Sequence, residues 1–140
     1  LKNFNIPKGI IAVDWWIFTI ILLNGYCGKY INNATTYYRQ SNENFVGINR
    51  ALNKDRLKKG ISVKKAHYKH VVEYCKQNNF EKEMNDYLMK YEQIIELELS
   101  IKDREFQKRY INVINPLMEK IYCGWWSEIL ELNTWREYAN

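Results

Sequence analysis

The stretch that decides the fold is residues 10–40, which read IIAVDWWIFTIILLNGYCGKYINNATTYYRQ. It contains a run without any charge over residues 15–28. The apolar and aromatic residues recur at steps of one, three and four, which is the spacing of a helix face. We therefore predict one long helix, with its first half buried on all sides and its second half amphipathic. Gly25 and Gly28 are its weak points, because each costs about 1 kcal/mol relative to Ala inside a helix.

The uncharged run is short for a membrane span, which needs about 20 apolar residues. Extending the run back to Ile10 would include Asp14, whose charge is costly in lipid. A buried core helix is therefore the preferred interpretation of this stretch. A membrane-associated protein anchored by a helix over residues 10–28 remains the alternative.

Composition favours a single all-α domain over residues 1–140. The chain has 140 residues and 46% hydrophobic residues, enough to bury a core without disulfides. It has only 6 Gly and 2 Pro, which disfavours a turn-rich β architecture. No linker or repeat divides it. We expect a helical bundle of four to six helices packed around the long first helix.

The same spacing argument places the remaining helices. We predict a short helix over 44–52, a polar basic loop over 53–60, and a helix over 62–77 with Ser62 as its N-cap. A long helix is expected over 80–99. Its buried row is predicted to comprise Met84, Leu88, Tyr91 and Ile95.

The final third of the chain is expected to hold two further helical segments. A helical stripe continues from the 80–99 helix to Pro116, where the chain should kink or restart because proline lacks a backbone N–H. The last helix is expected over 117–132.

Charge is unevenly distributed along the chain. Residues 1–70 hold 12 Lys and Arg against 3 Asp and Glu, whereas residues 71–140 hold 9 against 13. The excess is concentrated in residues 50–69, with 8 basic residues and 1 acid. Such a segment suits an anion, and lysines suit a nucleic-acid backbone better than base edges. The candidate anion-binding residues are Arg56, Lys58, Lys59, Lys64, Lys65 and Lys69. The alternative is a charged face neutralised by the acidic second half.

Tryptophans form two adjacent pairs, at 15–16 and 125–126, with Trp135 alone. Neighbouring helix residues point about 100° apart, so one member of each pair can lie in the core and the other on a rim. Tryptophan is enriched at binding hot spots. Trp16, Trp126 and Trp135 are therefore the candidate partner-binding residues, for a protein partner or for self-association.

No pattern indicates catalysis, a metal or a cofactor. His67 and His70 are three apart on one helix face and could share a metal, but a site would need further ligands from the following helix, and the Glu-x-x-His pair of di-iron bundles is absent. The carboxylates of Glu92, Glu96 and Glu98 are better explained as a salt-bridged helix face. We therefore predict a protein that is not an enzyme and has no metal, cofactor or evident small-molecule substrate.

The three cysteines, at 27, 75 and 123, do not form a disulfide pattern. They are interpreted as reduced, buried thiols, which favours a reducing, cytoplasmic compartment.

The sequence as a whole predicts a non-enzymatic helical module for protein–protein interaction or regulation. Such a module would act through aromatic rim residues and the basic segment. The alternatives are nucleic-acid or phosphate binding through residues 50–69, and membrane association through residues 10–28.

Overall fold

The structure is a computed structural model that describes residues 5–29, 31–33, 35, 51–120 and 126–139. Within these ranges the chain forms five helices and no strand, which confirms the all-α prediction. The helices are α1 (Val13–Leu23), α2 (Lys54–Asn78), α3 (Glu81–Ser100), α4 (Arg104–Lys120) and α5 (Leu132–Ala139).

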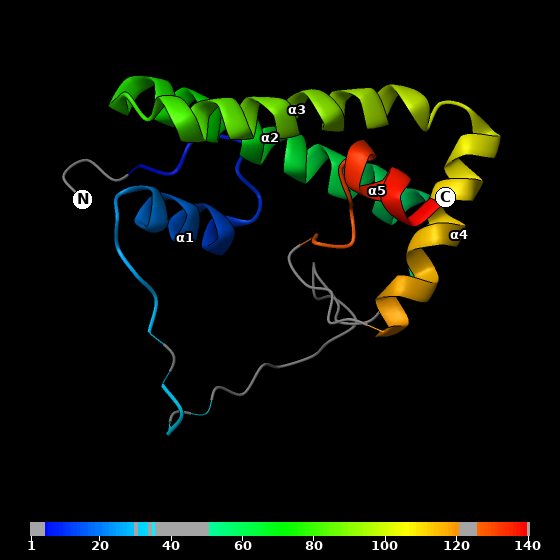
Figure 1. The fold of residues 1–140 in the computed structure, drawn as a ribbon, viewed down its shortest axis with the longest axis horizontal. Helices are drawn as coiled ribbons and strands as arrows, with labels where there is room; N and C mark the ends of the chain where they lie inside the picture. The colour runs from blue at the N-terminus through cyan, green and yellow to red at the C-terminus, as the bar shows by residue number, and fades with distance from the viewer. Residues whose placement is uncertain (1–4, 30, 34, 36–50, 121–125, 140) are drawn as a thin grey trace.

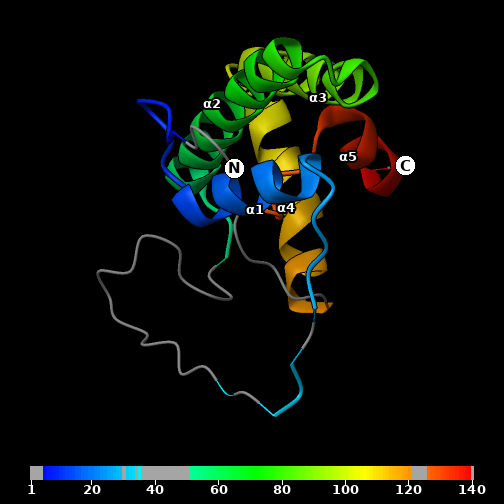
Figure 2. The same cartoon turned by 90° about the vertical axis from the view of Figure 1, so that its left-hand side faces the viewer.

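The two longest helices, α2 and α3, form an antiparallel pair on which the others pack (Figure 1). The reversal between them occurs at Asn79, which adopts the left-handed conformation with φ of 60° that Asn tolerates at a helix C-terminus. Helix α4 then leaves the end of α3 after a short turn in which Asp103 Oδ1 accepts hydrogen bonds from the backbone N–H groups of Glu105 and Phe106. Both views place α1 and α5 on the same side of the α2–α3 pair (Figure 2).

Helix α2 begins eight residues before the predicted start at Ser62, so the predicted basic loop is wrong. Asn53 is the N-cap, and its side chain accepts a hydrogen bond of 2.9 Å from the backbone N–H of Arg56. The first turns stay helical because Leu57 and Ile61 are buried, with 0% and 1% exposure. Burial of these two side chains outweighs the polar composition of the segment.

Gly60 lies inside α2 because another part of the chain passes close to it. A Cβ atom at this position would lie 2.4 Å from Ile129 Cγ1 and 2.8 Å from Trp126 Cε3. The glycine therefore does not end a helix. It allows residues 126–131 to approach the α2 backbone.

The prediction of a long first helix is wrong, because α1 has 11 residues and ends at Leu23. Gly25 has φ of +80°, and its N–H donates to the carbonyl of Leu22 at 3.0 Å. The N–H of Tyr26 donates to the carbonyl of Ile21 at 3.3 Å. These two bonds form a Schellman motif, the usual way for a glycine to terminate a helix. Gly25, one of the two suspected weak points, is the residue that ends it.

Helix α1 is also not buried on all sides. Trp16 and Ile20 are buried, and they form a small apolar cluster with Val71 and Cys75 of α2. In contrast, Phe18 and Leu22 on another face of α1 are exposed. The helix is thus a lateral element on the α2–α3 pair and not the centre of the bundle.

Helix α3 matches its predicted range within one residue at each end, but its buried row is different. The buried residues are Ile94 and Leu97, whereas the predicted Leu88 is 39% exposed. The row is shifted because α3 is covered along two sides, by α2 and by α5.

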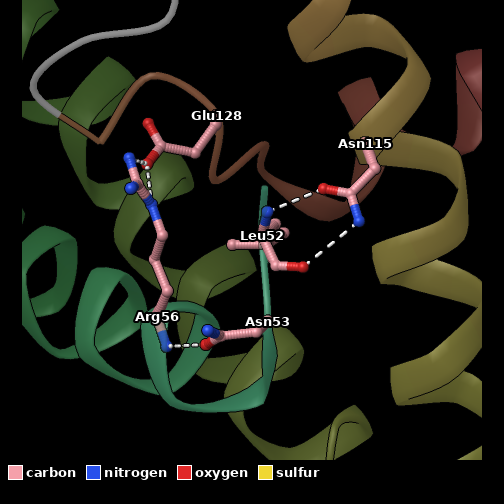
Figure 3. A network of polar contacts seen from close by, with 5 residues as sticks. All are labelled: Leu52, Asn53, Arg56, Asn115 and Glu128. Carbon is pink, nitrogen blue, oxygen red and sulfur yellow. Dashed lines mark hydrogen bonds and ion pairs between the residues drawn. The ribbon is translucent and has the colours of Figure 1, made fainter. Parts of the chain in front are cut away.

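The predicted restart at Pro116 is wrong, because α4 runs through the proline to Lys120, whereas a kink there stays a prediction. Ile114 and Met118 are buried on either side of the proline and hold the helix against the core. The Asn115 amide exchanges two hydrogen bonds with the backbone of Leu52, at 2.7 and 3.2 Å (Figure 3).

The predicted helix over 117–132 is also wrong. Its first four residues belong to α4, residues 126–131 are turns and coil, and α5 begins at Leu132. The predicted short helix over 44–52 falls mostly outside the described residues, and residues 51–53 are not helical.

Candidate functional site

The candidate anion-binding residues lie on two different faces of α2. Arg56 and Lys64 lie on the side that packs against residues 126–131, which we call the inner face. Lys58, Lys65 and Lys69 recur at steps of seven and four on another side, which we call the outer face.

On the inner face, Arg56 is paired with Glu128 (Figure 3). The guanidinium donates to Glu128 Oε1 from Nε at 2.9 Å and from a terminal nitrogen at 2.6 Å. The two side chains are only 12% and 0% exposed. Asn53 and Asn115 fix the chain just before Arg56, by capping α2 and by binding the Leu52 backbone. This arrangement is an internal clamp.

Two turns along the inner face, Lys64 and Tyr68 both donate hydrogen bonds to Glu131 Oε1, the lysine at 3.0 Å. Burial lowers the pKa of Lys64, although Glu131 opposes the shift. Burial alone would raise the pKa of Glu131, but Lys64 and Tyr68 outweigh that effect and hold the pKa below its ordinary value. Lys64 is therefore paired with Glu131 of the same chain.

The outer face is more open. Lys65 pairs with Glu98 of α3 at 2.7 Å, with both side chains more than a third exposed. Lys69 lies 3.9 Å from Glu73 and is 57% exposed. Lys58 and Lys59 are exposed. The structure thus divides the six candidate residues into two committed to buried pairs and four on accessible surface.

The three candidate partner-binding tryptophans are core residues in this structure. Trp16, Trp126 and Trp135 are 2%, 2% and 4% exposed. Trp126 lies next to the clamp, with Arg56 Cζ 5.9 Å from its ring centroid. Trp135 stacks on Tyr110 at 5.6 Å between α5 and α4. The rim member of the first tryptophan pair is Trp15, which is partly exposed.

His67 is buried under α1, with 1% exposure. Its ring stacks on Trp15 at 3.6 Å and 7°, and its Nε2 is 3.2 Å from Thr19 Oγ1. Thr19 Oγ1 itself donates to the carbonyl of Trp15, so His67 Nε2 is the donor to Thr19. No described residue binds His67 Nδ1. Burial, with help from the nearby charge of Lys64, lowers the pKa of His67 to about 3. The ring is therefore a neutral packing element.

Above this histidine, α1 and α3 enclose a groove of about 340 Å³. Trp15 and Thr19, which contact His67, are part of its lining. Phe18 and Leu22, which are 54% and 60% exposed, line it from the same helix. The full lining comprises Trp15, Phe18, Thr19, Leu22, Leu23, Glu83 and Tyr87. We call this set the α1–α3 groove.

Sequence reasoning did not identify the α1–α3 groove. The apolar pattern predicts that the first half of a helix over residues 10–40 is buried on all sides, which would place Phe18 and Leu22 inside. One available signal was the number of apolar faces on this helix, which is more than one neighbouring helix can cover.

Metal chemistry has no support from the described residues. Among them, no three His, Cys, Asp or Glu side chains gather as a metal would require. His67 faces Thr19, and His70 Nδ1 lies 2.9 Å from Glu73 Oε2. The two histidines thus have separate partners.

The structure also bears on the cysteines and on the predicted membrane alternative. Cys75 is buried as predicted, whereas Cys27 is exposed, which is contrary to prediction, and Cys123 lies outside the described residues. In the described part of the chain, no helix has both the length and the apolar character needed to cross a membrane.

Comparison with known proteins adds no relative. The chain matches no protein-family model, no curated protein and no solved structure.

Proposed function

We propose that this chain is a non-enzymatic helical protein-interaction module, and that the α1–α3 groove is its docking site. The observation that carries the proposal is the exposure of Phe18 and Leu22 on the wall of a concave site. Large apolar side chains gathered around a groove are typical of protein-binding surfaces.

The groove is suited to an amphipathic helix. Phe18 and Leu22 are one turn apart on α1, so they form a short ridge parallel to the helix axis. Leu23 and Tyr87 add apolar surface from the two sides of the groove. An incoming helix would place its apolar residues at i, i+3 and i+4 against this ridge, as in other helix-in-groove complexes.

The groove has a firm support. Trp15 and Thr19 rest on His67, and Trp16 and Ile20 are buried between α1 and α2. A preformed site loses less conformational entropy when a partner binds. We therefore expect the groove to bind without large rearrangement of α1.

The test uses three labelled helical peptides of about 18 residues, or five turns. They share one leucine stripe and carry lysine, glutamine or glutamate on the polar face. At least one should bind in fluorescence anisotropy, and Leu22→Glu should weaken it about tenfold or more, because burial of a leucine contributes about 1.5–3 kcal/mol.

The matched control is Leu99→Glu, since Leu99 is 55% exposed on α3 and does not line the groove. It should leave peptide binding unchanged. Absence of binding by all three peptides, or equal weakening by the two substitutions, would refute the proposal.

A second candidate function is nonspecific anion binding by the outer face of α2. It is favoured by the accessible lysines at 58, 65 and 69, which share one side of the helix. Each phosphate neutralised by a lysine steepens the salt dependence of binding. A gel-shift titration with duplex DNA at low salt tests this candidate, and absence of a shift rules it out.

A further inference from the structure

We propose that the partner of the α1–α3 groove is a cationic amphipathic helix whose lysine or arginine pairs with Glu83. This inference rests on the proposed function, because it specifies the occupant of the same groove. It is drawn from the charges that line the site.

Glu83 places a carboxylate at an otherwise mainly apolar site. Its side chain lines the groove next to Tyr87 and is partly buried. Among the described residues the Glu83 side chain makes no hydrogen bond or ion pair. Its negative charge acts on the Cys75 thiol, whose pKa is raised first by burial and then by Glu83. A cation brought by a partner stabilises a partly desolvated carboxylate more than a fully solvated one.

The rest of the groove does not supply that cation. Helix α1 carries a single charged residue, Asp14, which shares a face with Phe18 one turn later. On α3, the ammonium of Lys90 lies 5.1 Å from the Tyr87 ring centroid. Lys90 forms no ion pair with Glu83 in the described structure. Glu83 lines the groove, whereas Asp14 lies one turn before the apolar ridge and accepts a hydrogen bond from the backbone N–H of Trp15 at 2.9 Å. Both negative charges favour a basic partner.

The prediction of a basic partner runs against the overall charge, because the chain itself has a net charge of +5. Long-range electrostatics would favour an acidic ligand and would slow the approach of a cationic one. Preference for a cationic peptide would therefore have to come from the local carboxylates. The outer face of α2 is rich in lysine and would bind an acidic partner. If binding occurred there, the glutamate peptide would bind most tightly.

The experiment compares the lysine, glutamine and glutamate peptides at two ionic strengths. We expect the lysine peptide to bind most tightly and the glutamate peptide most weakly. Glu83→Gln should reduce affinity for the lysine peptide about fivefold to tenfold, which is about 1.0–1.4 kcal/mol, and leave the glutamine peptide unchanged, because it removes one charge-assisted hydrogen bond.

The matched control is Glu81→Gln. Glu81 also lies in the first turn of α3, so both substitutions remove the same interaction with the helix dipole. It is exposed and does not line the groove. This variant should retain full affinity for the lysine peptide, and thermal melting should show both variants folded.

The experiment distinguishes failure of the cationic-partner proposal from failure of the docking-site proposal. Equal binding of all three peptides, with the Leu22→Glu effect retained, would overturn the cationic partner and leave the groove as a docking site. Tightest binding of the glutamate peptide would also overturn it. A dimer in sedimentation that dissociates on Leu22→Glu would identify a second copy as the occupant instead.

Discussion

The inner and outer faces of α2 carry similar lysines and arginines, yet the fold uses them differently. On the inner face, Arg56 and Lys64 are buried against carboxylates from residues 126–131. On the outer face, Lys65 and Lys69 meet carboxylates while remaining substantially exposed. The difference shows that a basic run in the sequence is not one site, because helical geometry assigns its members to different surroundings.

The energetic consequences of the two faces should differ strongly. Removing one partner of a buried pair takes away much of the compensation of the other charge, whereas an exposed pair contributes little. Substitutions on the inner face should therefore change stability, and substitutions on the outer face should leave it almost unchanged.

The largest effect is expected for Glu128→Gln. The substitution removes the carboxylate that faces Arg56 and should lower the free energy of unfolding by about 3–5 kcal/mol. Urea denaturation followed by circular dichroism measures the change. Glu105→Gln, which removes the exposed partner of Lys108, should leave the free energy of unfolding nearly unchanged. Equal losses would remove the distinction between buried and exposed pairs.

The second prediction concerns pH and His67. Its pKa is about 3 in the fold and about 6.5 in the unfolded chain, so below pH 6.5 the unfolded chain binds a proton that the folded chain does not. Stability should fall by about 1.4 kcal/mol per pH unit, or roughly 2 kcal/mol between pH 6.5 and pH 5.

His67→Phe should remove most of this loss while retaining an aromatic ring beneath Trp15. His70→Gln should retain it, because His67 is still present. Thermal melts at several pH values provide the measurement, and an unchanged pH dependence in His67→Phe would contradict the assignment.

The third prediction concerns close packing on the inner face. Gly60→Ala should destabilise the protein by about 1–2 kcal/mol, because the added methyl group overlaps Ile129 and Trp126 and the cost of overpacking exceeds the gain in helix propensity. Ser62→Ala, at an exposed position two residues later, should be neutral or slightly stabilising. Chemical denaturation of both variants decides the point, and a stabilised Gly60→Ala would mean that residues 126–131 do not approach α2 as closely as described.

The smallest effect is expected on the outer face. Lys65→Gln removes the partner of Glu98, with both side chains partly exposed, and should cost less than about 1 kcal/mol, decreasing with added salt. A loss similar to that of Glu128→Gln would indicate that the two faces are equivalent.

The sequence was sufficient to predict much of the local structure. Periodicity predicted an all-α fold and the limits of α3, and the low helix propensity of glycine marked Gly25 as a weak point. Local signals failed where distant segments meet. Gly60 was interpreted as the end of a loop, because nothing near it in the sequence indicates that Trp126 and Ile129 pack against it.

The candidate site was harder to predict for the same reason. The basic segment is visible in the sequence, but its partition into buried and accessible cations depends on Glu128 and Glu131, which lie far along the chain. The α1–α3 groove depends on placing Phe18 and Leu22 beside Glu83 and Tyr87. The periodicity of apolar residues in the sequence does not reveal tertiary packing of this kind.

The central claim is that the α1–α3 groove, and not the basic surface of α2, is the docking site. The most direct test is titration of the ¹⁵N-labelled protein with the lysine peptide, followed by backbone amide chemical shifts. We expect the largest changes in α1 and in the first two turns of α3. Changes concentrated around Lys58, Lys65 and Lys69, or no changes at saturating peptide, would contradict the account.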